Sequence, residues 1–124
     1  MDYIYMRAAE MVLIEAEALA RQGKNAEAAT VLKELMSNRQ PSWNKTSVTV
    51  EDVLLQRRIE LWGEGFSYFD LKRNNKDIDR NYEGSNHLAG YLHTIPAFDV
   101  RWTYQIPQSE MQENSHIQDS EQNP

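Results

Sequence analysis

The sequence predicts a mainly α-helical fold, in which a helical hairpin and a third long helix precede an irregular, loop-rich C-terminal region. Two observations favour this architecture. Apolar residues recur at three- and four-residue steps within residues 3–22, 26–38 and 50–73, which is the period of an amphipathic helix. After Arg73 this period ends, and Pro96 and Pro107 lie in a stretch whose apolar residues alternate only loosely.

The first helix is predicted over residues 3–22. Asp2 precedes it as a suitable N-cap, and Gly23 follows it as a stop signal. Glu17 and Arg21 are one helical turn apart and carry opposite charges, so they are expected to pair. The predicted core face of this helix consists of Tyr5, Ala8, Ala9, Val12, Ala16 and Leu19.

The second helix is predicted over residues 26–38, with Asn25 as its cap. The connection to the first helix is so short that the two helices must run antiparallel. Ala16 and Ala28 are small, which permits the two helix axes to approach closely. The predicted core face consists of Ala28, Val31, Leu32, Leu35 and Met36.

The hairpin over residues 3–38 has the spacing of one tetratricopeptide-like unit, although any alanine-rich helical hairpin would show a similar pattern. The matching positions are Ala16, Leu19, Gly23, Ala28 and Leu32. A single unit of this kind cannot bury both of its faces. We therefore expect the hairpin to pack on another part of a protein, or to self-associate in isolation.

The third helix is predicted over residues 50–73, and Thr49 with Asp52 forms a capping box at its start. Gly63 and Gly65 weaken a helix, so a kink or close packing is expected there. An apolar stripe follows the helical period: Leu55, Ile59, Trp62, Phe66 and Phe69. We expect this stripe to be core, and the alternative is that its aromatic members Trp62, Phe66 and Phe69 form a flat platform on which a sugar ring stacks.

Residues 74–124 are predicted to be loops and a polar tail. The stretch from Asn74 to Asn86 is polar, and extended segments are expected over residues 87–107. Residues 112–124 contain a single apolar residue, Ile117, so this tail is expected to be ordered only where it docks.

The composition excludes several classes of function. At 124 residues the chain is one domain or part of one. The net charge of −6 at pH 7 argues against nucleic-acid binding, because no basic face is available. The absence of cysteine excludes disulfides, thiolate catalysis and cysteine-based zinc sites. No apolar run is long enough for a transmembrane helix, and Met1-Asp2-Tyr3 does not begin a signal peptide.

Glu60, Glu64 and Asp70 are the carboxylates that a hydrolase would use as general acid and general base. Catalytic pairs usually come from different elements around a cleft, whereas Glu60 and Glu64 lie on one predicted helix. Arg57 and Arg58 precede these glutamates and carry the opposite charge. We therefore interpret the carboxylates as part of an ion-pair network that joins this helix to its neighbours, and we predict no catalytic residue.

Large aromatic residues in the predicted loops are better candidates for a carbohydrate-stacking site, although such residues often anchor their own loop. They are Trp43, Tyr82, Tyr91 and Trp102. His87, His93 and His116 show no metal-ligand spacing, and the sequence contains no phosphate-binding glycine loop. Neither a metal nor a cofactor is predicted.

Three regions of the chain resemble, in the same order, motifs of the SusD/RagB family. Residues 7–18, RAAEMVLIEAEA, resemble its R-x-A-E-x-x-L-x-x-A-E-A segment, and residues 56–73, QRRIELWGEGFSYFDLKR, resemble its signature helix. Residues 106–111, IPQSEM, are similar to a run near the family's C-termini, and Gln122-Asn123-Pro124 resembles its terminal Q-N-P. The structural signature positions are Arg57, Arg58, Glu60, Glu64, Gly65, Phe69, Asp70 and Arg73.

The resemblance implies that residues 1–124 are the C-terminal part of such a domain, with a tetratricopeptide-like hairpin at 3–38, the signature helix at 50–73 and loops at 74–124. It implies a surface-exposed lipoprotein of Bacteroidetes outer membranes that binds oligosaccharides without cleaving them. Such a protein passes its glycans to a SusC-like, TonB-dependent transporter. The signal peptide and the lipid-anchor cysteine would then lie upstream of this chain.

Two other hypotheses remain at this point. The chain could be a helical interaction module that binds a protein partner through its hairpin and has no sugar site. It could also be a hydrolase that uses Glu60 and Glu64.

Overall fold

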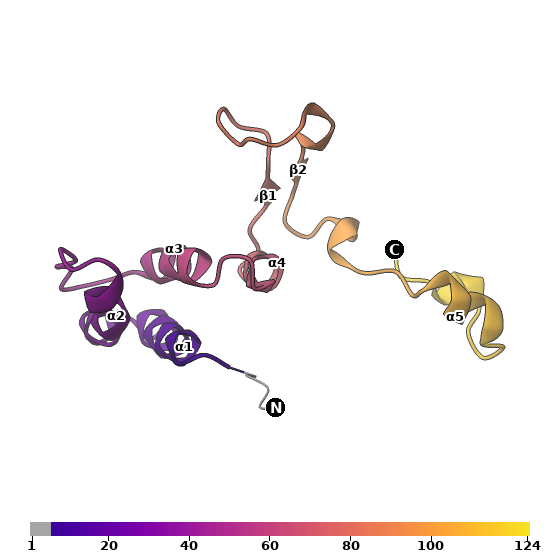
Figure 1. Ribbon diagram of the computed structural model, residues 1–124. Coiled ribbons are helices and arrows are strands. Elements are labelled where there is room, and N and C mark those ends of the chain that lie inside the picture. Colours follow the sequence, from indigo (N-terminus) through magenta and orange to yellow (C-terminus); the bar gives the residue numbers. More distant parts are fainter. Residues whose placement is uncertain (1–5) are drawn as a thin grey trace, which may run out of the picture. The chain divides into compact units, whose positions relative to one another are not determined.

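The computed structural model describes residues 6–124, so the predicted roles of Asp2 and Tyr5 lie outside the described residues. This part of the chain is mainly helical, as the sequence predicts (Figure 1). The helices and strands are α1 Ala8–Arg21, α2 Asn25–Arg39, α3 Val50–Glu60, α4 Phe66–Arg73, β1 Ile78–Asp79, β2 Thr94–Ile95 and α5 Gln108–Glu113. The chain divides into two compact units, one ending at Ser67 and one comprising Tyr68–Pro124, and the boundary falls within α4.

The predicted hairpin is formed by α1 and α2, and Gly23 ends α1 as expected. Gly23 has φ +76°, a left-handed conformation that glycine adopts without steric cost. The Gly23 N–H donates to the carbonyl of Ala20 at 3.0 Å, and the Lys24 N–H donates to the carbonyl of Leu19 at 3.0 Å. This pair of bonds is the Schellman arrangement, which satisfies carbonyls that the end of the helix leaves open.

The predicted cap of α2 is wrong. Asn25 is the first residue of the helix, and Lys24 occupies the N-cap position without a capping side chain. The backbone carbonyl of Asn25 instead accepts a hydrogen bond from the Val48 N–H at 3.1 Å. Val48 is buried, so this bond fixes the loop that follows α2 against the hairpin.

The core of the first unit lies where α1 packs against α2 and α3. Ala16 and Ala28 are completely buried, as expected for small residues between closely packed helices. Glu17 and Arg21 form the predicted pair at 2.7 Å, and Glu17 is buried. The core residues are Leu13, Ala16, Ala20, Ala28, Ala29, Leu32, Leu35, Met36, Val48, Val53 and Leu61.

The capping box at the start of α3 is confirmed. The Thr49 hydroxyl accepts from the Asp52 N–H at 3.3 Å, and the Asp52 carboxylate accepts from the Thr49 N–H at 3.0 Å. Lys45 adds an ion pair to the same carboxylate at 2.6 Å. The hydrogen bond from Lys45, followed by those from Thr49, lowers the pKa of Asp52.

The long third helix is interrupted, which corrects the prediction of one helix over residues 50–73. α3 ends at Glu60, a turn follows, and α4 begins at Phe66. Gly63 and Gly65 have φ +80° and +83°, and a Cβ added at either position would meet no atom within 4 Å. The two glycines therefore permit a left-handed turn and do not serve close packing.

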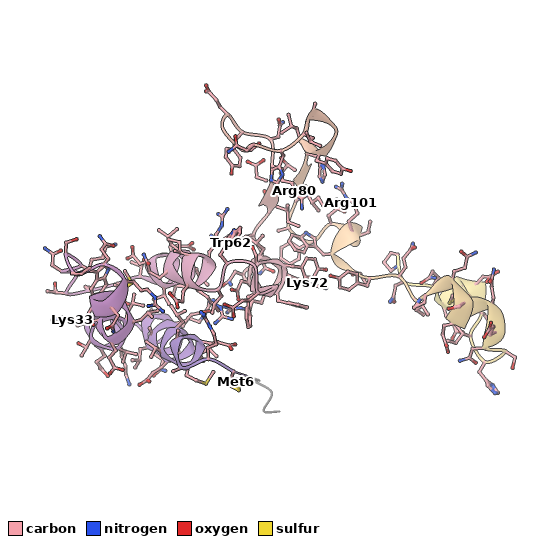
Figure 2. The ribbon with its side chains drawn as sticks, in the orientation of Figure 1. Met6, Lys33, Trp62, Lys72, Arg80 and Arg101 are labelled. Carbon is pink, nitrogen blue, oxygen red and sulfur yellow. The ribbon has the colours of Figure 1, made fainter. Side chains whose placement is uncertain are left out.

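The predicted core stripe on the third helix is wrong for the three members that precede α4. Leu55 and Ile59 are exposed, and Trp62, labelled in Figure 2, is 85% exposed. The face of α3 that packs in the core carries Val53 and Arg57. Side chains two positions apart in sequence, such as Val53 and Leu55, are separated by about 200° around the helix axis. Leu55 therefore points away from the core when Val53 points into it.

The rest of the stripe lies on α4. Phe66 packs against the core of the first unit, whereas Phe69, in the second unit, is exposed. The predicted core position is therefore confirmed for Phe66 and wrong for Phe69.

Glu60 joins the ends of three helices in the first unit. Its carboxylate accepts from Arg39, the last residue of α2, at 2.8 and 2.9 Å, and from Arg7, which precedes α1, at 3.1 Å. Arg7 also donates to the backbone carbonyl of Glu60 at 3.0 Å and pairs with Glu64 at 3.3 Å. The predicted network that joins this helix to its neighbours is therefore confirmed.

The arginines that the sequence suggested for this network are not the ones that pair with Glu60. Arg57 is buried, and its guanidinium lies 5.0 Å from the centre of the Phe66 ring, in a cation–π contact. Arg58 is exposed. The partners of Glu60 come from the hairpin, because the C-terminal end of α3 lies beside Arg7 and Arg39.

The second unit is built around Trp102, which is 4% exposed. Its backbone carbonyl accepts from the Tyr68 hydroxyl at 2.6 Å and from the Lys72 ammonium at 2.5 Å. Its indole N–H donates to the carbonyl of Pro96 at 2.7 Å. The Tyr68 ring lies between the rings of Trp102 and Tyr104, at 5.2 and 5.3 Å. These contacts hold the irregular segment after β2 against α4.

The short antiparallel pair of β1 and β2 lies at the base of the excursion from residue 80 to residue 93. Ile78 is opposite Ile95, and Asp79 is opposite Thr94. The Thr94 hydroxyl donates to the Asp79 carboxylate at 2.9 Å. A side-chain bond thus reinforces a pairing that is only two residues long.

The C-terminal tail docks through Gln122 and Asn123. The Gln122 amide accepts from the Ile106 N–H at 2.8 Å and donates to the Ile106 carbonyl at 3.1 Å. The Asn123 amide donates to the carbonyl of Tyr104 at 3.0 Å. The residues that resemble a terminal Q-N-P thus bind the backbone of an extended segment as a neighbouring strand would.

We predict that Glu60→Gln lowers the free energy of unfolding by about 1–2 kcal/mol, because it removes charge-assisted bonds to two arginines. Chemical denaturation measures this loss. The hydrogen bond from Arg39 holds the pKa of Glu60 below its ordinary value of 4.5. The stabilisation is therefore complete above that value and is lost as the pH falls through the folded-state pKa.

Glu15→Gln is the matched control, because Glu15 is exposed on α1. A difference between Glu60→Gln and wild type that did not shrink on acidification would contradict the assignment.

We predict that Gln122→Ala releases the tail from residues 104–106. The Ile106 amide then loses its acceptor, and its hydrogen exchange accelerates toward the rate of an unprotected amide. Exchange followed by NMR measures this change, and Gln112→Ala, at an exposed position of α5, is the control. Equal protection of Ile106 in the two variants would show that the Gln122 bonds do not hold the tail.

Candidate functional site

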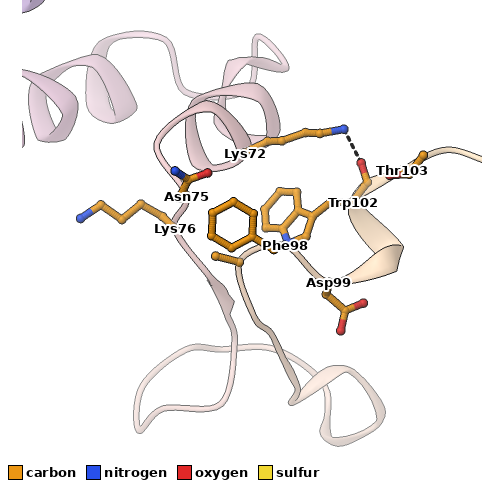
Figure 3. A pocket seen from close by; sticks show the side chains of 8 residues that line it. Lys72, Asn75, Lys76, Phe98, Asp99, Trp102 and Thr103 are labelled. Carbon is orange, nitrogen blue, oxygen red and sulfur yellow. Dashed lines mark hydrogen bonds between the residues drawn. The ribbon is translucent and has the colours of Figure 1, made fainter. Parts of the chain in front are cut away.

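A pocket of about 380 Å³ opens in the second unit, between the end of α4 and the segment that follows β2 (Figure 3). Pockets for small ligands range from about 300 to 1,000 Å³, so this one has room for a small molecule. The end of α4 and the turn after it contribute Lys72, Asn75 and Lys76, and the segment after β2 contributes Ala97, Phe98, Asp99, Trp102 and Thr103.

Phe98 is the most unusual residue of the pocket. It is 82% exposed, and its φ is +65°, in the left-handed region that bulky residues avoid. The Asp99 N–H donates to the carbonyl of Pro96 at 3.3 Å, so Phe98 is the third residue of a turn. Glycine or asparagine is preferred at such a position when φ is positive. The fold therefore presents a large aromatic side chain where a small residue would be less strained.

The turn that carries Phe98 is held from three sides. The Asp77 carboxylate accepts from the Ala97 N–H at 2.7 Å. The carbonyl of Pro96 receives the indole N–H of Trp102 in addition to the N–H of Asp99. Strained backbone persists only where its surroundings fix it, and it is concentrated at ligand-binding positions.

The polar groups around Phe98 differ in how they are bound. Lys72 is held by the carbonyl of Trp102, and Asp99 pairs with Arg101 at 2.7 Å. The bonds from Arg101 lower the pKa of Asp99 to about 2, so this carboxylate stays ionised at neutral pH. The side chains of Asn75 and Thr103 make no hydrogen bond to residues 6–124 and are therefore available to a ligand. Asn75 also has a positive φ, of 52°.

The four loop aromatics predicted from the sequence are placed differently from one another. Tyr82 and Tyr91 are exposed on the excursion between β1 and β2. Trp43 packs against the core of the first unit. Trp102 is buried, holds its own loop and also lines the pocket. Sugar binding by these four residues remains a prediction. Tyr82 and Tyr91 are the two whose rings are exposed.

Sequence reasoning missed Phe98 and Asn75. Phe98 lies in the predicted extended region, and no residue next to it in the sequence indicates a left-handed backbone conformation. The one usable signal was the sequence Pro96-Ala97-Phe98-Asp99, in which a proline and an aspartate flank a turn.

The carboxylates considered for hydrolysis are all bound to arginine. Glu60 and Glu64 pair with Arg7, and Glu60 also pairs with Arg39. Asp70 pairs with Arg73 at 2.8 Å. Within residues 6–124, no cluster of three or more acidic or histidine side chains could hold a metal ion. In the same range, no helix combines the length and the apolar character needed to cross a lipid bilayer.

Comparison with known proteins gives concordant results. The profile of the SusD family matches residues 1–124. The SusD-like protein P38 of Formosa agariphila is 33% identical over 90 residues, which is 63% of this chain and 18% of that protein. A crystal structure of a "Putative sugar binding protein" from Bacteroides vulgatus ATCC 8482 is similar with a TM-score of 0.80 and 29% identity. That similarity covers 96% of this chain and 28% of the solved chain, so the chain spans less than a third of either relative.

We predict that Phe98→Gly is more stable than Phe98→Ala by about 1 kcal/mol, because alanine keeps the cost of a Cβ in the left-handed region. Both variants remove the same exposed ring, so their difference isolates the strain of the turn. Thermal or chemical unfolding measures it. If the alanine variant were as stable as the glycine variant, the turn would store no strain.

Proposed function

We propose, on the premise that the chain belongs to the SusD family, that it is the C-terminal part of a glycan-binding protein. The observation that carries the proposal is the match of the family profile along the whole chain, together with a similar fold in a protein described as sugar-binding. We also propose the domain organisation expected from the sequence, with the hairpin over 3–38, the signature segment over 50–73 and the loops over 74–124.

The arrangement of charged groups supports binding without cleavage. A general acid needs a carboxyl group that is protonated near neutral pH. The pKa of Glu60 is held low by Arg39, and its carboxylate is committed to two arginines, so it is poorly suited to this role. We therefore propose that Glu60 and Glu64 stabilise the fold and that the protein is not an enzyme.

The proposed role of the intact protein follows from the family. It captures oligosaccharides at the surface of the outer membrane and passes them to a SusC-like, TonB-dependent transporter. It is held at the membrane as a lipoprotein. In this proposal residues 6–124 contribute a helical scaffold and the exposed loops around Tyr82, Tyr91 and Phe98.

A second candidate function is supported by the exposed face of α3. Leu55 and Ile59 are exposed one turn apart on this helix, and Trp62 is exposed in the turn after it. Large exposed apolar side chains that gather on one surface are typical of protein interaction sites. The chain would then be a helical interaction module without a sugar site of its own, and in isolation it would self-associate.

We predict that the 124-residue chain binds at least one class of oligosaccharide. Isothermal titration with oligosaccharides released from starch, plant cell walls and host glycoproteins measures this binding, with Tyr82→Ala and Tyr91→Ala testing the exposed loop aromatics. Light scattering over a range of concentrations follows the oligomeric state of the same samples. Absence of binding to all three classes, combined with concentration-dependent association, would favour the interaction module.

A further inference from the structure

We propose that the pocket beside the Pro96–Asp99 turn is a saccharide subsite, in which the Phe98 ring is the surface on which a sugar ring stacks. The proposal rests on the glycan-binding function and deepens it, because it names the residues that touch the sugar. It concerns the second unit alone.

The first argument is that the fold does not need this ring. Phe98 is almost fully exposed, so its side chain adds little to the stability of the second unit. Its backbone conformation is unfavourable for any residue with a Cβ, and the turn would form more readily with glycine. Phe98 strains its turn and makes few packing contacts, and strained residues of this kind are concentrated at ligand-binding positions. We therefore assign its ring to ligand binding.

The second argument is the polar complement of the ring. Figure 3 shows the Phe98 ring between the Asn75 amide and the Trp102 indole. The amide of Asn75 and the hydroxyl of Thr103, which also lines the pocket, can each donate and accept hydrogen bonds. A sugar ring has an apolar C–H face and a rim of hydroxyl groups, and each hydroxyl both donates and accepts. An aromatic face bordered by an amide and a hydroxyl matches both features.

The third argument is the balance of charge, which favours a neutral sugar over an anion. The Lys72 ammonium is held by the carbonyl of Trp102, and Lys76 and Asp99 point away from the Phe98 ring in Figure 3. Asp99 is paired with Arg101. None of these three charged side chains is directed at the Phe98 ring in Figure 3, so the ring surface offers no counter-charge to a phosphate or sulfate group, whereas a neutral, hydroxyl-rich ligand needs none.

The test is an NMR titration of the isotopically labelled 124-residue chain with maltotriose, xylotriose and chitotriose. We expect the amide signals of Asn75, Phe98 and Thr103 to shift together and to saturate. Phe98→Ala and Phe98→Gly should each weaken binding by about tenfold or more, because both lose the stacking ring. Phe98→Tyr keeps an aromatic ring and should retain binding.

Ile14→Ala is the control, because it removes an exposed apolar side chain from α1 in the first unit. Its affinity for the same sugar should equal that of the wild-type chain, and the unfolding curve of each variant confirms that it is folded.

Three outcomes would overturn the proposal. If the wild-type chain binds a sugar but Phe98→Ala binds it equally well, with shifts at Tyr82 and Tyr91, the subsite is wrong and the glycan-binding function stands. If inorganic phosphate produces the same shifts and competes with the sugar, the pocket is an anion site. If none of the three sugars binds and the wider oligosaccharide titration is also negative, the subsite and the proposed function fail together.

Discussion

The first unit depends on one carboxylate. Glu60 is only 11% exposed as a side chain, and it lies at the C-terminal end of α3, where the helix dipole disfavours negative charge. Arg39 and Arg7 offset this cost, and Arg7 also satisfies the backbone carbonyl of Glu60, one of the acceptors that a helix end leaves open. The same contacts bring together the last residue of α2, the residue before α1 and the end of α3. The position of α3 on the hairpin, and hence the burial of Val53 and Leu61, follows from this arrangement.

Several features that depend on neighbouring residues were predictable from the sequence, whereas most features that depend on distant residues were not. The left-handed Gly23, the capping box of Thr49 and Asp52, and the core face of α2 are all decided within about one helical turn. The choice of face on α3 was not, because this helix is apolar on two sides. Contacts with the hairpin select the side of Val53, and the break at Gly63 prevents the stripe from continuing as one surface.

The candidate site was the least predictable part, for a related physical reason. A left-handed Phe98 requires bonds from Asp77 and Trp102, which lie 21 residues before it and four residues after it. No local sequence pattern indicates that these two side chains bond to the turn that carries Phe98. Trp102, a loop aromatic predicted as a candidate for stacking, depends on a contact of the same kind. Its indole N–H finds the carbonyl of Pro96, so the ring is buried and becomes part of the frame that holds Phe98 in place.

The second unit has little regular structure, and between residues 96 and 106 its backbone is held mainly by side chains. Along residues 96–106, backbone groups bond to the side chains of Asp77, Tyr68, Lys72, Trp102, Gln122 and Asn123. A sheet ladder would impose alternation along this segment, whereas individual side-chain bonds permit turns of any shape, including the strained one at Phe98. A loop fixed in this way loses little conformational freedom when a ligand binds, so less of the contact energy is spent on ordering it. The irregular half of the chain is therefore the half suited to presenting a rigid surface to a flexible ligand.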